Sequence, residues 1–254
     1  MVGVFDSGAG GLSVWKELVR LMPDMEFAYF SDSGHCPYGP KPPSQIIERA
    51  KFITDFLLDK GASAIVVACN TATAAAISYL RENYTVPFVG MEPAIKPAAL
   101  HSKSGVVGVL ATAGTLKGEL YLRTSNTFAG NVKIVERVGE GLVEAVERGD
   151  FGSEEVISLL HKFIDPMLEA GADHIGLGCT HYPFLTEAIA AITAGRAEIV
   201  NPAPAVARQV MKVIGYQPSN GTGNTRFYTT GDIEKLRFLA RTINPALPDL
   251  SFSC

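Results

Sequence analysis

The sequence has few cysteines and no long apolar run, and each absence excludes a class of protein. Four cysteines in 254 residues are too few for a disulfide-stapled secreted domain. No stretch reaches the 18 or more apolar residues that are typical of a transmembrane helix. The first apolar run, residues 2–5, ends at Asp6 and is too short for a signal peptide. We therefore expect a cytoplasmic protein that spans no membrane and keeps its thiols reduced.

Clustered positive charge is also missing. The 22 Lys and Arg residues against 26 Asp and Glu residues give a net charge of −4, without a basic block. Nucleic-acid-binding proteins usually carry a basic face, so we expect no nucleic-acid partner. The charge does not argue against a small acidic ligand, because a local site can oppose the net charge.

Short apolar runs alternate with helical patterns along the chain. The expected strands are 2–5, 26–31, 64–68, 87–90, 105–110, 132–137 and 174–177. The expected helices are 12–21, 44–60, 72–83, 116–125, 153–169 and 183–194. Continuous apolar runs suit strands that are covered on both faces. The alternation therefore predicts an α/β fold with parallel sheets between layers of helices.

Three pairs of similar segments indicate an internal duplication. DFLLDKGASAIVVAC (55–69) aligns without a gap on DPMLEAGADHIGLGC (165–179), with six of fifteen positions identical. VGVFDS (2–7) likewise resembles VGVLAT (107–112), and MEPA (91–94) resembles VNPA (200–203). We expect two related domains, 1–92 plus 205–254 and 93–204, in a pseudo-twofold arrangement around a cleft. The C-terminal segment, 205–254, holds a strand and a helix and is too short to be a domain of its own.

Each of the two longest similar segments, 55–69 and 165–179, ends in a cysteine, Cys69 in the first and Cys179 in the second. Ligands of open parallel sheets bind beyond the carboxyl ends of the strands, where both cysteines are expected. A helix start lowers the pKa of a thiol, and we expect Asn70 or Thr71 to cap the first helix and Thr180 the second. A free cysteine is often only a small buried apolar residue. Two of them at matching positions favour a functional pair.

Two related units that face each other place these thiols on opposite sides of one cleft. Inverting a carbon centre requires a base on one face and an acid on the other, and the roles exchange in the reverse direction. A thiol that titrates near neutral pH can serve as either. The pair therefore predicts racemisation through a near-planar carbanion.

Further polar residues stand at the same strand ends. Asp6 and Ser7 end the first strand in VFDSGAGGLSV, whose glycines suit an anion at a helix start. The spacing is not that of a G-x-G-x-x-G dinucleotide site. His181 follows Cys179 by two residues and can relay a proton, while Thr112 can donate to a carboxylate. The alternative is structural: Asp6, Ser7 and Thr112 as helix caps and His181 as a buried, hydrogen-bonded side chain.

A loop rich in glycine and proline, SDSGHCPYGPKPPS (31–44), follows the second expected strand. Pro37, Tyr38 and Gly39 can form a rigid wall with exposed N–H groups, or an ordinary surface loop. Cys36 in this loop has no duplicate, so we expect it to be structural or incidental. Cys254 ends the chain and is expected to be inert.

The sequence does not predict a metal site. Structural zinc takes four ligands, usually with a close C-x₂₋₄-C pair that is missing here. A catalytic site made of Cys69, Cys179 and His181 remains the alternative. GLVEAVERGD places Glu144 on a helix face, where a carboxylate is usually just solvated.

FDSGAGGLSV, PYGPK, ACNTATA, GVLATAGT, GCTHYP and the late TTGD together resemble the glutamate racemases of the aspartate/glutamate racemase superfamily. The resemblance covers nearly the whole chain. It implies two α/β domains with the site between them and an interconversion of L- and D-glutamate that needs no cofactor. It further implies a supply of D-glutamate for peptidoglycan, and a homodimer.

The resemblance also implies roles for individual residues. Cys69 takes the proton from D-glutamate and Cys179 from L-glutamate, with Asp6 and His181 assisting. Glu144 matches a carboxylate near the substrate ammonium, although ERVGEGLVE replaces a more usual apolar stretch with Cys-Pro. The positions that match substrate contacts are Asp6, Ser7, Pro37, Tyr38, Gly39, Asn70, Thr71, Thr112, Glu144, Thr180 and His181. The alternatives are racemisation of aspartate or another amino acid, and an amino-acid-binding protein without turnover.

Overall fold

A computed structural model describes residues 1–128, 130–221, 223–245 and 251–253, so Cys254 lies outside the described residues. The strands are β1 Val2–Asp6, β2 Phe27–Ser31, β3 Ala64–Val67, β4 Phe88–Gly90, β5 Val106–Ala111, β6 Lys133–Val138, β7 His174–Gly178, β8 Glu198–Val200, β9 Thr225–Thr229 and β10 Ser251–Ser253. The helices are α1 Leu12–Leu21, α2 Pro43–Asp59, α3 Asn70–Asn83, α4 Ile95–His101, α5 Ala113–Leu116, α6 Glu119–Phe128, α7 Leu142–Glu147, α8 Glu154–Glu169, α9 Thr186–Thr193, α10 Ala203–Val213 and α11 Ile233–Ile243. Short 3₁₀ turns form at η1 Ser33–His35 and η2 Tyr182–Leu185.

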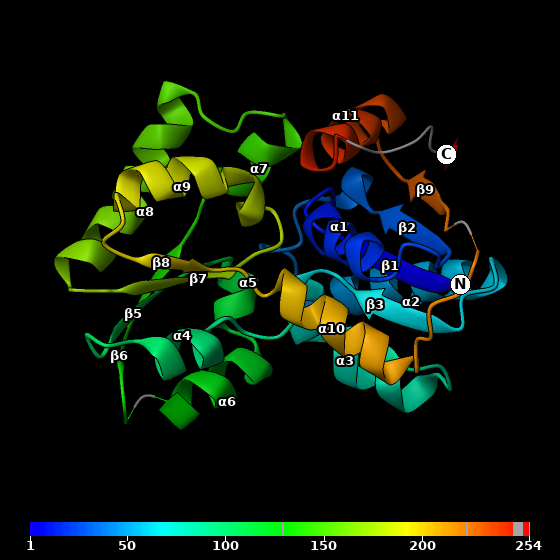
Figure 1. Cartoon of the computed structure of the whole chain (residues 1–254), viewed down its shortest axis with the longest axis horizontal. Helices are drawn as coiled ribbons and strands as arrows, with labels where there is room; N and C mark the ends of the chain where they lie inside the picture. The colour runs from blue at the N-terminus through cyan, green and yellow to red at the C-terminus, as the bar shows by residue number, and fades with distance from the viewer. Residues whose placement is uncertain (129, 222, 246–250, 254) are drawn as a thin grey trace.

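The strands form two parallel sheets, which lie side by side in Figure 1. The first has the order β10-β9-β2-β1-β3-β4 and the second the order β6-β5-β7-β8. The block β2-β1-β3-β4 and the second sheet share one topology, in which the first strand of the unit pairs with the second and the third. This shared order is the structural counterpart of the duplication, and it confirms the expected α/β fold.

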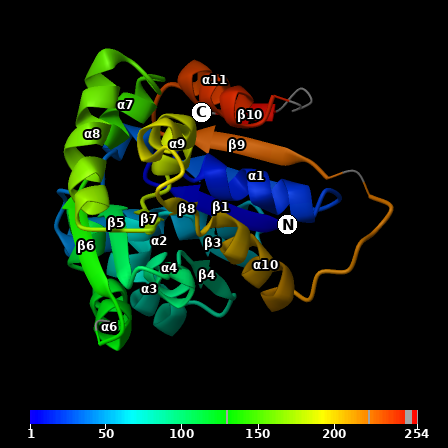
Figure 2. The same cartoon turned by 60° about the vertical axis from the view of Figure 1, so that its left-hand side comes forward.

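Both faces of the first sheet are covered by helices, which explains its continuous apolar strands. Val4 of β1 shares a core with Trp15 of α1, Val206 of α10 and Leu236 of α11. The next residue, Phe5, joins the opposite core beneath α2 and α3, because successive side chains of a strand point to opposite faces. In the second sheet, α8 and α9 cover one face and α4 and α6 the other (Figures 1 and 2).

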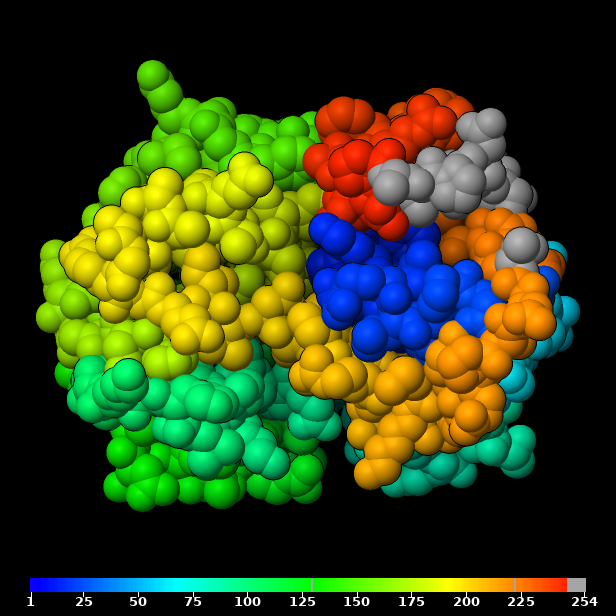
Figure 3. All heavy atoms as spheres, viewed as in Figure 1, coloured from blue at the N-terminus to red at the C-terminus, as the bar shows by residue number. Residues whose placement is uncertain are grey.

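The chain crosses between the two sheets twice. It leaves the first sheet between β4 and α4 and returns between β8 and α10, which packs on α1. The surface is notched between the two halves in Figure 3. The proposed division at residue 205 falls inside α10, because that helix already begins at Ala203. Among the described helices, none combines the length and apolar character that a membrane span requires.

Candidate active site

The carboxyl ends of β1, β3, β5 and β7 carry the residues that the sequence singled out. In each unit the second strand pairs with one edge of the first strand, and the third strand pairs with the opposite edge. This topology opens a crevice beyond the first and third strands. Asp6 ends β1 and Cys69 follows β3, while Thr112 follows β5 and Cys179 follows β7. Both units therefore direct their polar strand ends towards the space between them.

Both cysteines line one cavity between the units. Of the expected substrate contacts, only Asp6 and Glu144 are outside its lining. The lining consists of Ser7, Pro37, Tyr38, Gly39, Cys69, Asn70, Thr71, Thr112, Val143, Cys179, Thr180 and His181. The free volume is about 10 Å³, which is room for about one water molecule. The two halves are therefore closed on each other in this structure.

Cys69 occupies the N-cap position of α3, where the strand run AIVV gives way to the helical NTATAAA. Its Sγ accepts the Ala72 N–H at 3.4 Å and lies 3.6 Å from Ser7 Oγ. The positive end of the helix dipole faces the sulfur. Burial nevertheless raises the pKa of the Cys69 thiol, and the nearby Asp6 carboxylate raises this pKa further. The resting structure thus favours Cys69 as a thiol.

Asp6 is fully buried behind Cys69. Its Oδ2 accepts the Gly11 N–H at 2.7 Å. A Cβ at Gly11 would lie 2.7 Å from the Asp6 Cβ, so only glycine allows this approach. Burial raises the pKa of Asp6 above its ordinary value. A carboxyl with a raised pKa beside a thiol can exchange a proton with it.

Cys179 faces a different partner. Its Sγ lies 3.7 Å from Nδ1 of His181, and Nε2 of His181 lies 2.7 Å from Oε1 of Glu147. Burial alone would lower the pKa of His181, but contacts with Cys179, Cys36 and Glu147 outweigh burial and raise the pKa. A protonated ring can donate Nε2–H to Glu147 and Nδ1–H to the Cys179 sulfur. His181 thus links Glu147 to the Cys179 sulfur and is the group that can exchange a proton with that sulfur.

The glycine-rich loop after β1 accommodates these two side chains. A Cβ at Gly8 would lie 2.2 Å from Glu147 Oε1, and one at Gly10 would lie 2.4 Å from His181 Nδ1. The Ala9 N–H donates to Glu147 Oε1 at 2.6 Å. The anion at this helix start is therefore a carboxylate of the protein itself, supplied by the other unit.

Glu147 is the functional residue that the sequence reasoning missed. Glu144, the carboxylate that the resemblance favours, is exposed on α7 and does not line the cavity. Glu147 ends the same helix with its side chain only 14% exposed. Val143 and Glu147 are four residues apart and hence share one face of the helix. The spacing places Glu147 beside Val143, which lines the cavity, but this link is visible only in the structure.

The expected helix caps are wrong in part. Cys69 itself caps α3, so Asn70 and Thr71 lie in its first turn. The 3₁₀ turn η2 separates Cys179 from α9, and no side chain caps either element, which removes the expected role of Thr180. Thr112 does cap α5, accepting the Thr115 N–H at 3.2 Å.

Threonine hydroxyls join the two units beside the cysteines. Thr71 Oγ1 of the first unit lies 2.9 Å from Thr112 Oγ1 of the second, and Thr115 Oγ1 lies 2.9 Å from Thr112 Oγ1. Asn70 adds a buried Oδ1 that has no hydrogen-bond partner among the described residues. An orphan acceptor in a cavity indicates a ligand that can donate.

The loop that carries Tyr38 is anchored by Asp32. Asp32 is fully buried and accepts the Tyr38 hydroxyl at 2.6 Å, the Arg49 guanidinium at 2.8 and 2.9 Å, and the Thr230 hydroxyl at 2.9 Å. Burial alone would raise the pKa of Asp32, but the Arg49 and Tyr38 hydrogen bonds outweigh it and lower the pKa.

We expect Asp32→Ala to lower the free energy of unfolding by about 3 kcal/mol, because it leaves a half-buried Arg49 without its partner. A depressed folded-state pKa stabilises the fold above the ordinary value of 3.8 and loses this effect as the pH falls through the folded pKa. The difference between the two proteins should therefore shrink on acidification. Urea unfolding at several pH values measures this difference in the free energy of unfolding. Asp165→Ala, which removes an exposed pair with His161, is the control and should cost less than about 1 kcal/mol.

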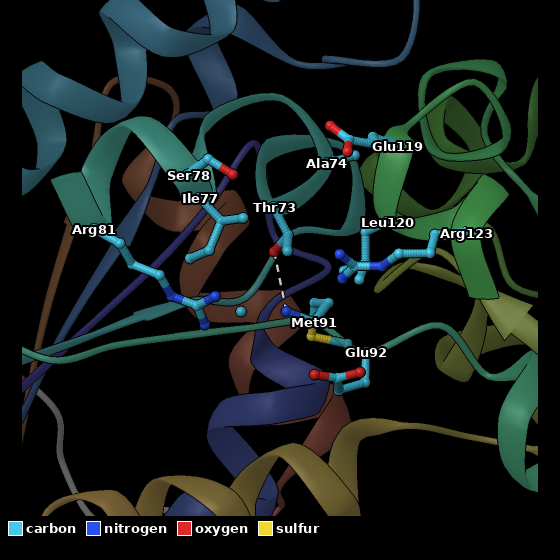
Figure 4. Close-up of a pocket in the computed structure, with 11 residues that line it drawn as sticks. Thr73, Ala74, Ile77, Ser78, Arg81, Met91, Glu92, Glu119, Leu120 and Arg123 are labelled. Atoms are coloured by element: carbon cyan, nitrogen blue, oxygen red, sulfur yellow. Dashed lines mark hydrogen bonds between the residues drawn. The ribbon is translucent and has the colours of Figure 1, made fainter.

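A larger cavity lies on another side of α3, with a free volume of about 210 Å³. Figure 4 shows Arg81 of α3 and Arg123 of α6 approaching it from opposite sides. Thr73 Oγ1 accepts the Met91 N–H at 3.0 Å in the same view. Neither paired cysteine lines this cavity, so its volume does not make it the catalytic centre.

The fold and the paired cysteines define a racemase. The Asp/Glu/hydantoin racemase family model matches residues 3–210, and the chain belongs to that family. Among curated relatives, glutamate racemase of Pseudomonas putida is 47% identical over 240 residues, covering 93% of this chain and 91% of that protein.

Solved structures agree with this assignment. Glutamate racemase RacE1 of Bacillus anthracis superposes with a TM-score of 0.89 at 29% identity, covering 100% of this chain and 96% of that chain. Glutamate racemase of Francisella tularensis in complex with D-glutamate superposes with a TM-score of 0.84 at 26% identity, covering 99% and 96%.

Proposed function

We propose that this chain is a glutamate racemase, which interconverts L- and D-glutamate by proton transfer between Cys69 and Cys179. The observation that carries the proposal is that both thiols line one cavity, each approaching from its own unit. The D-glutamate bound in the Francisella tularensis relative supports the choice of substrate. A supply of D-glutamate for peptidoglycan, a cytoplasmic location and a homodimer are parts of the same proposal.

One thiolate removes the α-proton while the other thiol delivers a proton to the opposite face. Cys179, beside the imidazolium of His181, deprotonates L-glutamate, and the Cys69 thiol completes the inversion. In the reverse direction Cys69 passes its proton to Asp6 and deprotonates D-glutamate, while Cys179, which carries a proton supplied by the His181 imidazolium, protonates the opposite face. The two half-sites thus carry unlike partners, a carboxylate and an imidazolium, for the same task.

The substrate carboxylates require donors, and α3 supplies them. The first N–H groups of a helix have no partner within the helix, and here the Ala72 N–H turns to Cys69. The N–H groups of Asn70 and Thr71 then face an anion at the positive end of the helix. Such preorganised donors stabilise the charge that builds on the α-carboxylate as the proton leaves. Asn70 Oδ1 accepts from the substrate ammonium.

The test is proton exchange in D₂O with the purified protein. We expect deuterium at the α-carbon of glutamate from either enantiomer, with loss of optical rotation, measured by NMR and polarimetry. A binding protein would leave the α-proton in place. Faster exchange with aspartate than with glutamate would assign the other substrate of this family.

A further inference from the structure

A thiol that the proposed reaction does not use lies next to the reacting centre. Cys36 was expected to be incidental, but its Sγ, a Glu147 oxygen and a His181 ring nitrogen all lie within 4.8 Å of one another. We propose that these three residues bind Zn²⁺ or a similar thiophilic divalent cation, and that the bound cation inhibits the enzyme. Thiolate, imidazole and carboxylate are the ligands that zinc takes in proteins.

The three ligands come from separate segments and from both units. Cys36 follows η1 on the first unit, while Glu147 ends α7 and His181 follows β7 on the second. The His181 and Glu147 side chains are 2% and 14% exposed, so the cluster is not a chance group of surface acids. Gly8 leaves it room, because a Cβ there would lie 2.2 Å from Glu147 Oε1 and 3.0 Å from Cys36 Sγ.

A zinc ion binds nitrogen and oxygen at about 2.0 Å and sulfur at about 2.3 Å, which places its ligand atoms roughly 3–4 Å apart. The three ligand atoms lie within 4.8 Å of one another, so small shifts reach that geometry, in which His181 Nε2 and Glu147 Oε1 move slightly apart. The cation would replace the proton between His181 Nε2 and Glu147 Oε1, now 2.7 Å apart. The Ala9 N–H can keep its bond to Oε1, since a carboxylate oxygen has a second lone pair.

One contact opposes the cation. The Gly10 N–H points at His181 Nε2 from 3.2 Å, and it must give way before a metal occupies that nitrogen. The protein supplies three ligands, and water completes the fourth position. We therefore expect weaker binding than at a structural zinc site with four protein ligands.

Inhibition follows from what His181 does. Its Nδ1 lies 3.7 Å from Cys179. With a metal on Nε2 the ring holds only the Nδ1 proton, and passing that proton to Cys179 would leave a costly imidazolate instead of a neutral imidazole. The cation also ties the first unit to the second, because its ligands come from both. This consequence rests on the proposed racemase function, whereas cation binding itself does not.

The test uses the purified full chain with two probes. Co²⁺ binding should give a thiolate-to-cobalt charge-transfer band, and Zn²⁺ should inhibit racemisation reversibly with EDTA. Measured against its own uninhibited rate, Cys36→Ser should lose the charge-transfer band and need at least tenfold more Zn²⁺ for the same fractional inhibition. Cys36→Ala, which adds no hydroxyl, should behave in the same way. Cys69→Ala should keep the band.

An unchanged band and unchanged inhibition in both Cys36 variants would overturn the proposal and assign the metal to the other thiols. A wild-type protein without a charge-transfer band would also overturn it. A band that depends on Cys36 in a protein without racemase activity would leave the metal site in place and reject the proposed function. The two failures are therefore distinguishable.

Discussion

Replacing Cys69 or Cys179 with alanine is expected to lower racemisation roughly 10²–10⁴-fold or more, because each thiol is the acid or base for one face of the α-carbon. Both side chains are small and lie at the end of a strand, so the fold should survive the change. Circular dichroism and unfolding experiments check the fold, and polarimetry measures the rate. Asp165→Ala, at an exposed position on α8, is the control and should keep its activity.

The two enantiomers have equal free energy, so kcat/KM must fall by the same factor in both directions in any variant. The assignment of each cysteine to one enantiomer therefore cannot be read from kcat/KM. It can be read from single-enantiomer exchange in D₂O. Any residual exchange in Cys69→Ala should occur with L-glutamate, and any in Cys179→Ala with D-glutamate. The opposite pattern would reverse the assignment, and full racemisation in either variant would remove that cysteine from the mechanism.

Asp6→Asn is expected to slow racemisation roughly 10²-fold or more, because the amide cannot take the proton of the Cys69 thiol. The amide oxygen can still accept the Gly11 N–H, so the variant keeps the local geometry. The raised pKa of Asp6 places the acid limb of kcat/KM above pH 3.8 in the wild-type protein. Activity should rise through this limb as Asp6 loses its proton, and the limb should be absent in Asp6→Asn.

The pH dependence separates this chemical role from a structural one. A variant that was merely misfolded would lose activity at every pH and keep the shape of the profile. Asp165→Asn, at an exposed position on α8, should leave both the rate and the profile unchanged. An acid limb that persists in Asp6→Asn would contradict the proton transfer to Asp6.

The regular elements were predictable where the local pattern agreed with the packing. Helix α1 begins and ends at the predicted residues 12 and 21, because its apolar face alone settles the boundaries. All seven predicted strands form, and most of them are continuous apolar runs, whereas β6 carries Lys133, Glu136 and Arg137. Strand β8, the short helices α4 and α7 and the longer helix α10 were missed, because their burial depends on neighbours far along the chain.

The candidate site was predictable to the extent that it follows strand ends. The positions of Asp6, Cys69 and Cys179 follow from parallel topology, which brings every carboxyl end to one edge. The positions of Glu147 and Cys36 do not, because neither residue follows a strand: Glu147 ends helix α7 of the second unit, and Cys36 follows the 3₁₀ turn η1 of the first. Their proximity to His181 is a property of how two units meet, and a pattern within one unit does not encode it.

The small free volume between the thiols has a kinetic consequence. Glutamate is many times larger than one water molecule, so neither loading nor release can occur with the halves shut. The two segments that connect the sheets lie together, because one cavity is lined by residues of both: Glu92, Pro93, Asn201 and Pro202. We expect the two halves to open about these connecting segments, and a viscous solvent, which slows such a motion, to lower the turnover rate.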